Sequence, residues 1–270
     1  MKALWIRTGE AGLPLVADLP LPFRRITRPI DPEIFRRQAR GENVGKPRLL
    51  PATGLQCRRT VGAHDDAGRV IDGRGLVFVI SGEVRVSAGG GVHLFRGGDL
   101  YFQDDLGGRA HRAECEGDCR LLFLGVADSW MPEGETGGTG AAPAPADGRP
   151  LLRRMYKAVD DRSYFRDFAE LFPEPGRWTP PRPAVGFHFV HFPPGFEIGW
   201  HPEGVNNFVV MLSGALELEV GGDGAIAVFG PGDVCLAEDR TGEGHIDRTH
   251  GETRMALIVF EDEHLWPMAS

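Results

Sequence analysis

The sequence predicts an all-β protein that is built from two similar sandwich or barrel domains joined in tandem. Three observations lead to this fold class. They are an internal repeat, an apolar period of two residues within each copy, and a segment rich in glycine and proline between the copies. A chain of 270 residues has room for two domains of ordinary size.

The repeat becomes visible when the sequence is shifted by 132 positions. Val79-Ile-Ser-Gly-Glu then falls on Met211-Leu-Ser-Gly-Ala. With the register two residues later, Phe95-Arg-Gly-Gly-Asp falls on Phe229-Gly-Pro-Gly-Asp. A repeat of this length indicates two copies of one domain. A comparison of the copies therefore shows which residues only one of them has kept.

Residues 131–150 separate the two copies and are dominated by glycine, proline and alanine, with no apolar period. Such a composition is typical of a flexible linker. We therefore expect an N-terminal domain at 1–130 and a C-terminal domain at 151–270.

Each copy alternates apolar and polar residues as half-buried strands do, for example in Leu216-Glu-Leu-Glu-Val220 and Val84-Arg-Val-Ser-Ala88. Tight turns are predicted at Pro231-Gly-Asp and at Gly97-Gly-Asp. Short strands with a turn every eight to twelve residues are typical of a sandwich or barrel.

One short helix is expected ahead of the strands in each copy, at residues 31–39 and 163–171. The first has Asp31 as a cap and Pro32 directly after it. Because the two segments stand at matching places, we expect both to be arms that pack on the exterior of a barrel.

The composition limits the function and the location of the protein. A net charge of -8 and a pI near 5.6 argue against nucleic acid or an anionic membrane as a partner. No apolar run is long enough to span a bilayer or to serve as a signal peptide. The one close cysteine pair, Cys115 and Cys119, could be a metal clip or a redox pair, but its spacing favours two cysteines that flank a turn. A reducing cytoplasm is the expected compartment.

The chemistry is concentrated in the C-terminal copy. His201, Glu203 and Asn207 are two and four residues apart, so a regular strand would place all three on one face. A later segment that begins at Gly232 returns a second histidine, His245. Two histidines and a carboxylate inside a barrel form a triad suited to Fe(II), or a site for Zn, Mn or Ni.

These two segments resemble the two sequence motifs of the cupin superfamily. The first motif is matched at Gly195, His201 and Gly214, and the second at Gly232, Gly242 and His245. The resemblance covers nearly all of the chain outside the linker, as in a two-domain bicupin. It implies two double-stranded β-helix, or jelly-roll, barrels in tandem with short helical arms.

The resemblance also implies a set of metal ligands, with two departures from the usual motif. Glu203 stands where a second histidine is usual, and Asn207 stands where a glutamate is usual. The implied ligands of one divalent metal are therefore His201, Glu203, His245 and Asn207. Fe(II) is the leading candidate, and Zn, Mn or Ni are alternatives. Asn207 would be a weak ligand or a donor to substrate, and the alternative is a metal-free pocket such as that of epimerase-like cupins.

The N-terminal copy keeps little of this site. At the repeat offset Arg69, Ile71 and Gly75 replace the three motif residues, and only His111 survives, in the place of His245. One histidine cannot hold a metal alone. We therefore expect the N-terminal barrel to be a degenerate copy with a structural or ligand-gating role, and a plain packing domain is the favoured interpretation.

Two further pairs of polar residues are left open by the sequence. His188 and His191 are three positions apart, so they face opposite sides of a strand and one of them could reach the pocket. Glu238 and Asp239 could orient His245 or simply cap the turn that precedes it.

We predict a metal-dependent enzyme that acts on a small organic molecule, as an oxygenase with Fe(II) or as an isomerase or lyase with another metal. Glu203 and His245 are the candidate catalytic residues. The alternatives are a non-catalytic binding protein and a metal-free isomerase with His245 as the base. The expected partner is the substrate alone, and the two barrels would form a pseudo-dimer within a monomer, or the chain a homodimer.

Overall fold

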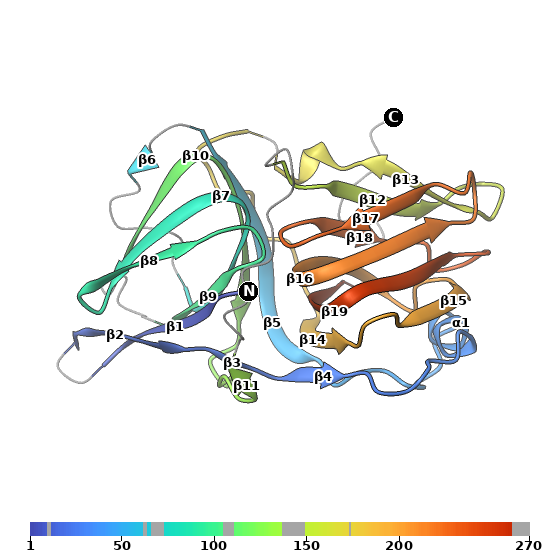
Figure 1. Ribbon diagram of the computed structural model, residues 1–270, viewed down its shortest axis with the longest axis horizontal. Helices are drawn as coiled ribbons and strands as arrows, with labels where there is room; N and C mark the ends of the chain where they lie inside the picture. Colours follow the sequence, from blue (N-terminus) through green and yellow to red (C-terminus); the bar gives the residue numbers. More distant parts are fainter. Residues whose placement is uncertain are drawn as a thin grey trace.

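Two β-barrels lie side by side in the computed structural model of the chain (Figure 1). The structure describes residues 1–9, 12–61, 64–65, 73–104, 111–136, 149–172 and 174–260. Strands dominate these residues, and the only α-helix among them is α1 (Glu33–Ala39). The predicted all-β class with tandem barrels is therefore confirmed.

The two barrels repeat the same order of strands. The N-terminal barrel consists of β1 (Ala3–Thr8), β2 (Pro14–Asp18), β5 (Leu50–Thr60), β6 (His64–Asp65), β7 (Gly75–Ala88), β8 (Gly91–Phe95), β9 (Leu100–Asp104) and β10 (His111–Val126). The C-terminal barrel consists of β12 (Leu152–Lys157), β13 (Ser163–Asp167), β14 (Gly186–Phe192), β15 (Glu197–His201), β16 (Asn206–Val220), β17 (Ile226–Phe229), β18 (Val234–Ala237) and β19 (His245–Phe260). In both, the first strand pairs in parallel with the strand before the last. The long antiparallel pairs β7–β10 and β16–β19 also correspond.

Several strands of each barrel face the other barrel across a shared core, among them β7 and β16. Both strands carry a continuous apolar run, because each is buried on both faces. Alternate residues of the two runs pack in a core between the barrels: Leu76, Phe78, Ile80, Phe208, Val210 and Leu212. Their neighbours Val77 and Met211 point instead into the interiors of their own barrels.

The predicted tight turns of the two copies meet at this contact. Gly232 has a φ of 89°, and a Cβ atom there would lie 2.3 Å from the carbonyl oxygen of Ile80 and 3.0 Å from the Cα atom of Gly97. Only glycine fits both the backbone conformation and the close approach. The turn glycines therefore set how closely the barrels pack.

Each half of the chain also extends an arm onto the other barrel (Figure 1). β3 (Pro20–Leu21), β4 (Phe23–Arg25) and α1 leave the N-terminal barrel, and β4 pairs in parallel with β14. In return, residues 174–182 run along β5, with bridges from Arg182 to Leu55 and from Trp178 to Arg58. The arms are thus exchanged between the two halves.

The helix expected at residues 163–171 is wrong. This segment forms β13, which pairs with β12, followed by a single 3-10 turn, η2 (Ala169–Leu171). β12 begins at Leu152, which is 149 positions after the start of β1 at Ala3. Because this offset exceeds 132, residues 163–171 correspond to β2 and not to α1. The arm of the N-terminal half is longer by the difference, 17 residues.

The first helix is confirmed, although its place differs from the expected one. It begins at Glu33, whose backbone N–H donates to Asp31 Oδ1 at 3.0 Å. Arg36 donates to the backbone oxygen of Trp200 at 2.8 Å, so α1 lies on the C-terminal barrel, beside β15 (Figure 1). The helix covers a cavity there and is not a simple exterior brace.

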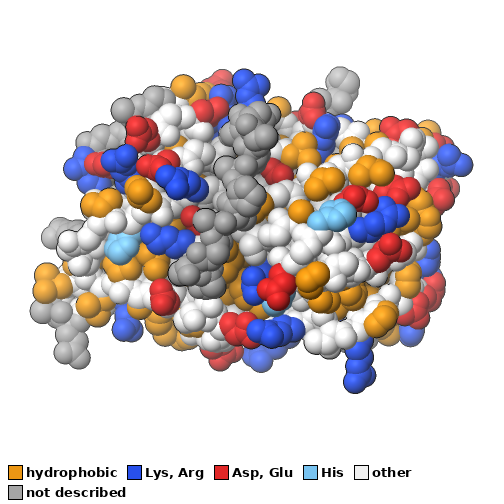
Figure 2. All heavy atoms as spheres, viewed as in Figure 1, with side chains coloured by type: hydrophobic (Ala, Val, Ile, Leu, Met, Phe, Trp, Pro, Cys, Tyr) orange, Lys and Arg blue, Asp and Glu red, His pale blue; other side chains and the backbone are white. Residues whose placement is uncertain are grey.

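Three remaining predictions concern the linker, the cysteines and the membrane. Within the expected linker, β11 (Glu135–Thr136) pairs with β3, and residues 137–148 lie outside the described residues. All four cysteines are buried free thiols, and Cys115 and Cys119 flank a bulge in β10. No helix in the described part of the chain is long and apolar enough to cross a membrane. Acidic and basic side chains intermingle on the face of the molecule that Figure 2 shows.

Candidate metal centre

The C-terminal barrel encloses a cavity of about 440 Å³. Its wall is mainly apolar and includes Val190, Phe192, Ile198, Val209, Leu216 and Met255. The arm of the N-terminal half covers part of it, with Ile34 and Phe35 of α1 among the lining residues. A cavity of this size fits a small organic molecule.

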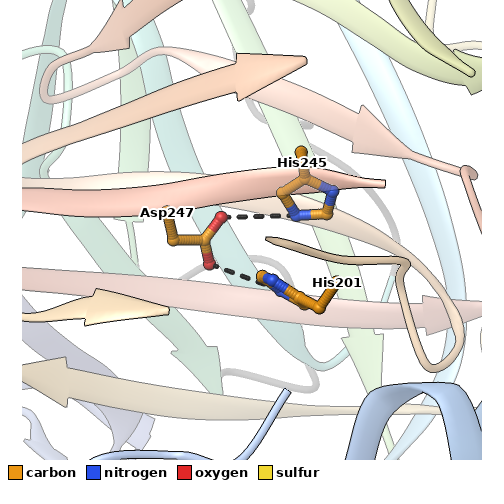
Figure 3. A group of neighbouring side chains, drawn as sticks. All are labelled: His201, His245 and Asp247. Atoms are coloured by element: carbon orange, nitrogen blue, oxygen red, sulfur yellow. Dashed lines mark ion pairs between the residues drawn. The ribbon is translucent and has the colours of Figure 1, made fainter. Parts of the chain in front are cut away.

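Three polar side chains converge on this cavity, His201, His245 and Asp247 (Figure 3). His201 is the last residue of β15 and stands opposite His245, the first residue of β19. Asp247 follows two residues later and therefore points to the same side of β19. One ligand atom from each of the three residues lies within 4.8 Å of the others. This is the two-histidine, one-carboxylate set expected for Fe(II) and related metals.

Hydrogen bonds on the far side of each ring prepare both histidines as ligands. His201 Nδ1 lies 2.8 Å from the backbone oxygen of Gly199, and His245 Nδ1 lies 2.8 Å from Asp239 Oδ2. Because these oxygens accept, each Nδ1 carries the proton and each Nε2 faces Asp247. His245 Nε2 lies 3.3 Å from Asp247 Oδ1, and His201 Nε2 lies 3.9 Å from Asp247 Oδ2.

The charges of the site follow from its burial. Burial, and then the neighbouring His245, lower the pKa of His201 to about 4, so this ring is neutral at pH 7. Burial would also lower the pKa of His245, but Asp239 and Asp247 outweigh it and raise that pKa well above the usual value. Without a metal, the proton on His245 is therefore shared with two carboxylates. A divalent cation at the Nε2 atoms would replace it.

Glu203 and Asn207 lie next to this group, but, contrary to the prediction from the sequence, they do not lie on the same strand as His201. The expectation that they share one strand face with His201 is wrong, because β15 ends at His201 and β16 begins at Asn206. A turn between the strands brings Glu203 Oε1 to 3.8 Å from His245 Nε2. Asn207 Nδ2 donates to Glu203 Oε2 at 3.1 Å. Burial raises the pKa of Glu203 to about 8, so the carboxyl group keeps its proton at neutral pH.

Asp247 is the site residue that the sequence reasoning missed. The signal was available, because Asp247 is two residues from His245 and alternation along a strand places both on one face. Its Oδ1 atom is buried and faces only the His245 ring, 3.3 Å away, and Asn207 Oδ1 is buried with no hydrogen-bond partner among the described residues. Buried oxygens without a donor are costly unless a cation or another ligand satisfies them. The donor set therefore fits a metal ion.

The structure also decides between the readings that the sequence left open. His188 lines the cavity, whereas His191 lies on the other face of β14 near Glu252, at 3.7 Å. Asp239 orients His245 and also accepts a hydrogen bond from Ser163 Oγ at 2.7 Å. Glu238 is in a buried ion pair with Arg154 instead.

The N-terminal barrel shows no comparable cluster among its described residues. A Cβ atom at Gly75 would lie 2.4 Å from the ring of Phe123, so this position is filled by packing. The ring of His111 stands edge-on to Tyr101, with 5.9 Å between the ring centroids. Arg69 and Ile71 lie outside the described residues.

The known proteins that are similar to this chain are solved structures with low sequence identity to it. No family model matches the sequence, and no curated protein matches it. A cupin 2 conserved barrel domain protein from Leptotrichia buccalis is 12% identical, with 89% of this chain and 100% of that chain covered and a TM-score of 0.39. The oxalate decarboxylase of Bacillus subtilis is 15% identical, with 80% and 66% covered and a TM-score of 0.26.

A salicylate 1,2-dioxygenase mutant from Pseudoaminobacter salicylatoxidans, solved with gentisate, is 12% identical, with 78% and 66% covered and a TM-score of 0.32. Of these three proteins, the one from Leptotrichia buccalis is described as a cupin barrel domain protein. The chemistry of the site follows from its own residues.

Proposed function

We propose that the protein is a metal-dependent cupin enzyme that acts on a small organic molecule inside the C-terminal barrel. The observation that carries this proposal is the convergence of His201, His245 and Asp247 on one side of a cavity of about 440 Å³. Three protein ligands leave further positions of a metal free for substrate. Fe(II) is the metal that this donor set favours, and Zn, Mn or Ni are alternatives.

The residues around this centre have different roles in the proposed reaction. A bound divalent metal would supply Lewis-acid chemistry, or redox chemistry in the case of Fe(II). Glu203 lies beside the ligand set, with Oε1 3.8 Å from His245 Nε2, so its carboxyl group is placed to exchange a proton with a reacting group. The amide of Asn207 holds the carboxyl group of Glu203 in place. The apolar wall keeps water away from the reacting atoms.

One observation favours a second candidate, a metal-free isomerase. Asp239 bonds to His245 Nδ1 at 2.8 Å and is itself held by Ser163, which is also how a general base is oriented. In that case His245, whose pKa is raised by Asp239 and Asp247 when no metal is bound, would give its proton to the substrate as a general acid and take it back as the base of the return step. The two candidates differ in whether the protein needs a metal.

Metal content measured by plasma mass spectrometry tests the proposal. We expect about one metal ion per chain in the wild type, as for a site with a single set of ligands. The ion should be lost in His245→Ala and in Asp247→Ala. His250→Ala is the matched control, because His250 is an exposed histidine on the same strand. A wild type that holds no metal even after anaerobic loading with Fe(II) would favour the metal-free candidate.

A further inference from the structure

Several basic side chains of the long N-terminal arm line the cavity of the other barrel. They are Arg24, Arg25, Arg28 and Lys46. Arg25 is paired with Glu135 at 2.7 Å. The other three have no acidic partner among the described residues, and each is exposed. In a chain with 38 acidic and 30 basic residues, unpaired cations gathered at one cavity call for an explanation.

The acidic groups of the cavity cannot serve as their partners. Glu203 and Asp247 are the two acidic lining residues, and both are occupied by contacts with the histidine centre. Their side chains are only 14% and 20% exposed, respectively. His201 and His245 of the cavity are therefore buried, whereas its cationic side chains are exposed. The rest of the lining is mainly apolar.

Strand pairing explains why Arg24 belongs to this cavity. In the parallel pair of β4 and β14, Arg24 stands opposite Val190, which also lines the cavity. His188, two residues before Val190, lines the same cavity, and its Nδ1 atom is buried without a hydrogen-bond partner among the described residues. A polar group that can bond to a ligand thus lies near Arg24.

We infer that the cavity binds a small organic oxyanion, whose charged group is held by Arg24, Arg28 and Lys46 while its apolar body extends toward His201 and His245. The chemical class is a carboxylate or phosphate monoester on an uncharged apolar chain. The inference rests on the proposed function only for what happens at His201 and His245. Guanidinium groups suit oxyanions because they offer paired N–H donors in one plane.

The repeat gives independent support to this role of the arm. The corresponding arm of the C-terminal half is 17 residues shorter and contacts the N-terminal barrel, where the described residues contain no metal-ligand cluster. The longer N-terminal arm contains β3, β4 and α1 and lies over the barrel that has the cluster (Figure 1). Of the two barrels, the one with the histidine cluster is therefore also the one that is covered by the longer arm.

A matched set of six-carbon probes tests the inference by calorimetry on metal-free protein. Hexanoate and hexyl phosphate carry the charge, hexanamide is neutral, and hexylamine is positively charged. We expect at least one of the two anions to bind about tenfold more tightly than the amide, as a charge-assisted bond implies. The preference between the two anions identifies the head group. The amine should bind most weakly.

Variants of the arm locate the binding. Arg24→Gln and Arg28→Gln should each weaken anion binding several-fold, and the triple variant with Lys46→Gln should bind anion and amide equally. Arg37→Gln is the matched control, because Arg37 lies on the same arm, is paired with Glu42 and does not line the cavity. All variants should keep the thermal stability of the wild type, because the changed side chains are exposed.

The inference would be overturned if the amide or the amine bound as tightly as both anions, or if neither anion bound at all. It would also be overturned if the triple variant kept the wild-type preference for an anion. The calorimetry uses metal-free protein, so its result does not depend on whether the protein binds a metal. If the anions are preferred but the protein binds no metal, only the metal proposal is refuted. A metal site without an anion preference would refute this inference alone.

Discussion

His188 shows at the scale of a residue how burial decides the charge of a side chain in this cavity. Burial, followed by the nearby Arg24, lowers the pKa of its imidazole to about 4 from 6.5. The neutral ring is therefore the form that fits the folded protein. Protonation inside the cavity would place an unsolvated charge next to a guanidinium group.

This lowered pKa predicts how stability depends on pH. Between pH 6.5 and 4 the unfolded chain binds a proton at His188 that the folded protein does not, so the free energy of unfolding falls as the pH decreases. The stabilising contribution is complete above pH 6.5 and is lost as the pH falls to about 4. Its slope is at most about 1.4 kcal/mol per pH unit.

Urea unfolding of the wild type and of His188→Gln at several pH values measures this contribution. The variant should lack this part of the slope. Its free energy of unfolding should therefore rise relative to that of the wild type as the pH falls from 6.5 to 4. Parallel stability curves for the two proteins over this range would show that His188 does not carry the effect.

At the scale of an element, α1 covers the cavity and touches the histidine centre. The ring of Phe35 lies against His201, with 4.4 Å between the ring centroids. Gln38 is buried on the same helix and packs against Gly204, where a Cβ atom would come within 2.1 Å of its Oε1 atom. The helix is therefore seated closely over the turn that carries Glu203.

We expect Phe35→Ala to open this cover without removing a ligand. A chelator should then remove the metal from the loaded protein several-fold faster, because His201 becomes more accessible to water and to the chelator. Stopped-flow release to a chromophoric chelator measures the rate. Arg37→Ala is the control, because Arg37 is exposed on the same helix. Equal release rates in the wild type and Phe35→Ala would mean that α1 does not limit access.

At the scale of the whole molecule, the two barrels are joined by a shared core and by exchanged arms. The core between the barrels contains residues from both, and the turn at Gly232 lies against Ile80 and Gly97 of the other barrel. We propose that this contact takes the place of a dimer interface within one chain. We propose that the chain is a monomer in solution for this reason.

Gly232→Ala tests how much the close approach of the turns matters. A residue other than glycine at this φ costs roughly 1–3 kcal/mol, and the clash with Ile80 adds to that cost. Gly224→Ala is the matched control, because Gly224 has a φ of 69° but nothing within 4 Å of the added atom. Urea unfolding should show the larger loss for Gly232→Ala. Equal losses would mean that the turns can separate at little cost.

Features that depend on a local pattern could be predicted from the amino-acid sequence. Alternating apolar residues, turn glycines and the repeat predicted two barrels, and the motif spacing predicted that His201 and His245 belong to one site. These signals are local because a strand of period two and a turn with positive φ each constrain a few neighbouring residues. The helix predicted at 163–171 was wrong because the two segments were matched at an offset of 132 residues. Before the strands of the repeat the offset is 149, so 163–171 corresponds to β2.

Only the tertiary structure decided which groups meet across the fold. Asp247 joins the centre because β15 and β19 pair at His201 and His245, and Glu203 reaches it through a turn. The cations of the arm line the cavity of the other barrel because β4 pairs with β14, far away in the sequence. Contacts of this kind depend on strand pairing between distant segments, which a local pattern does not specify.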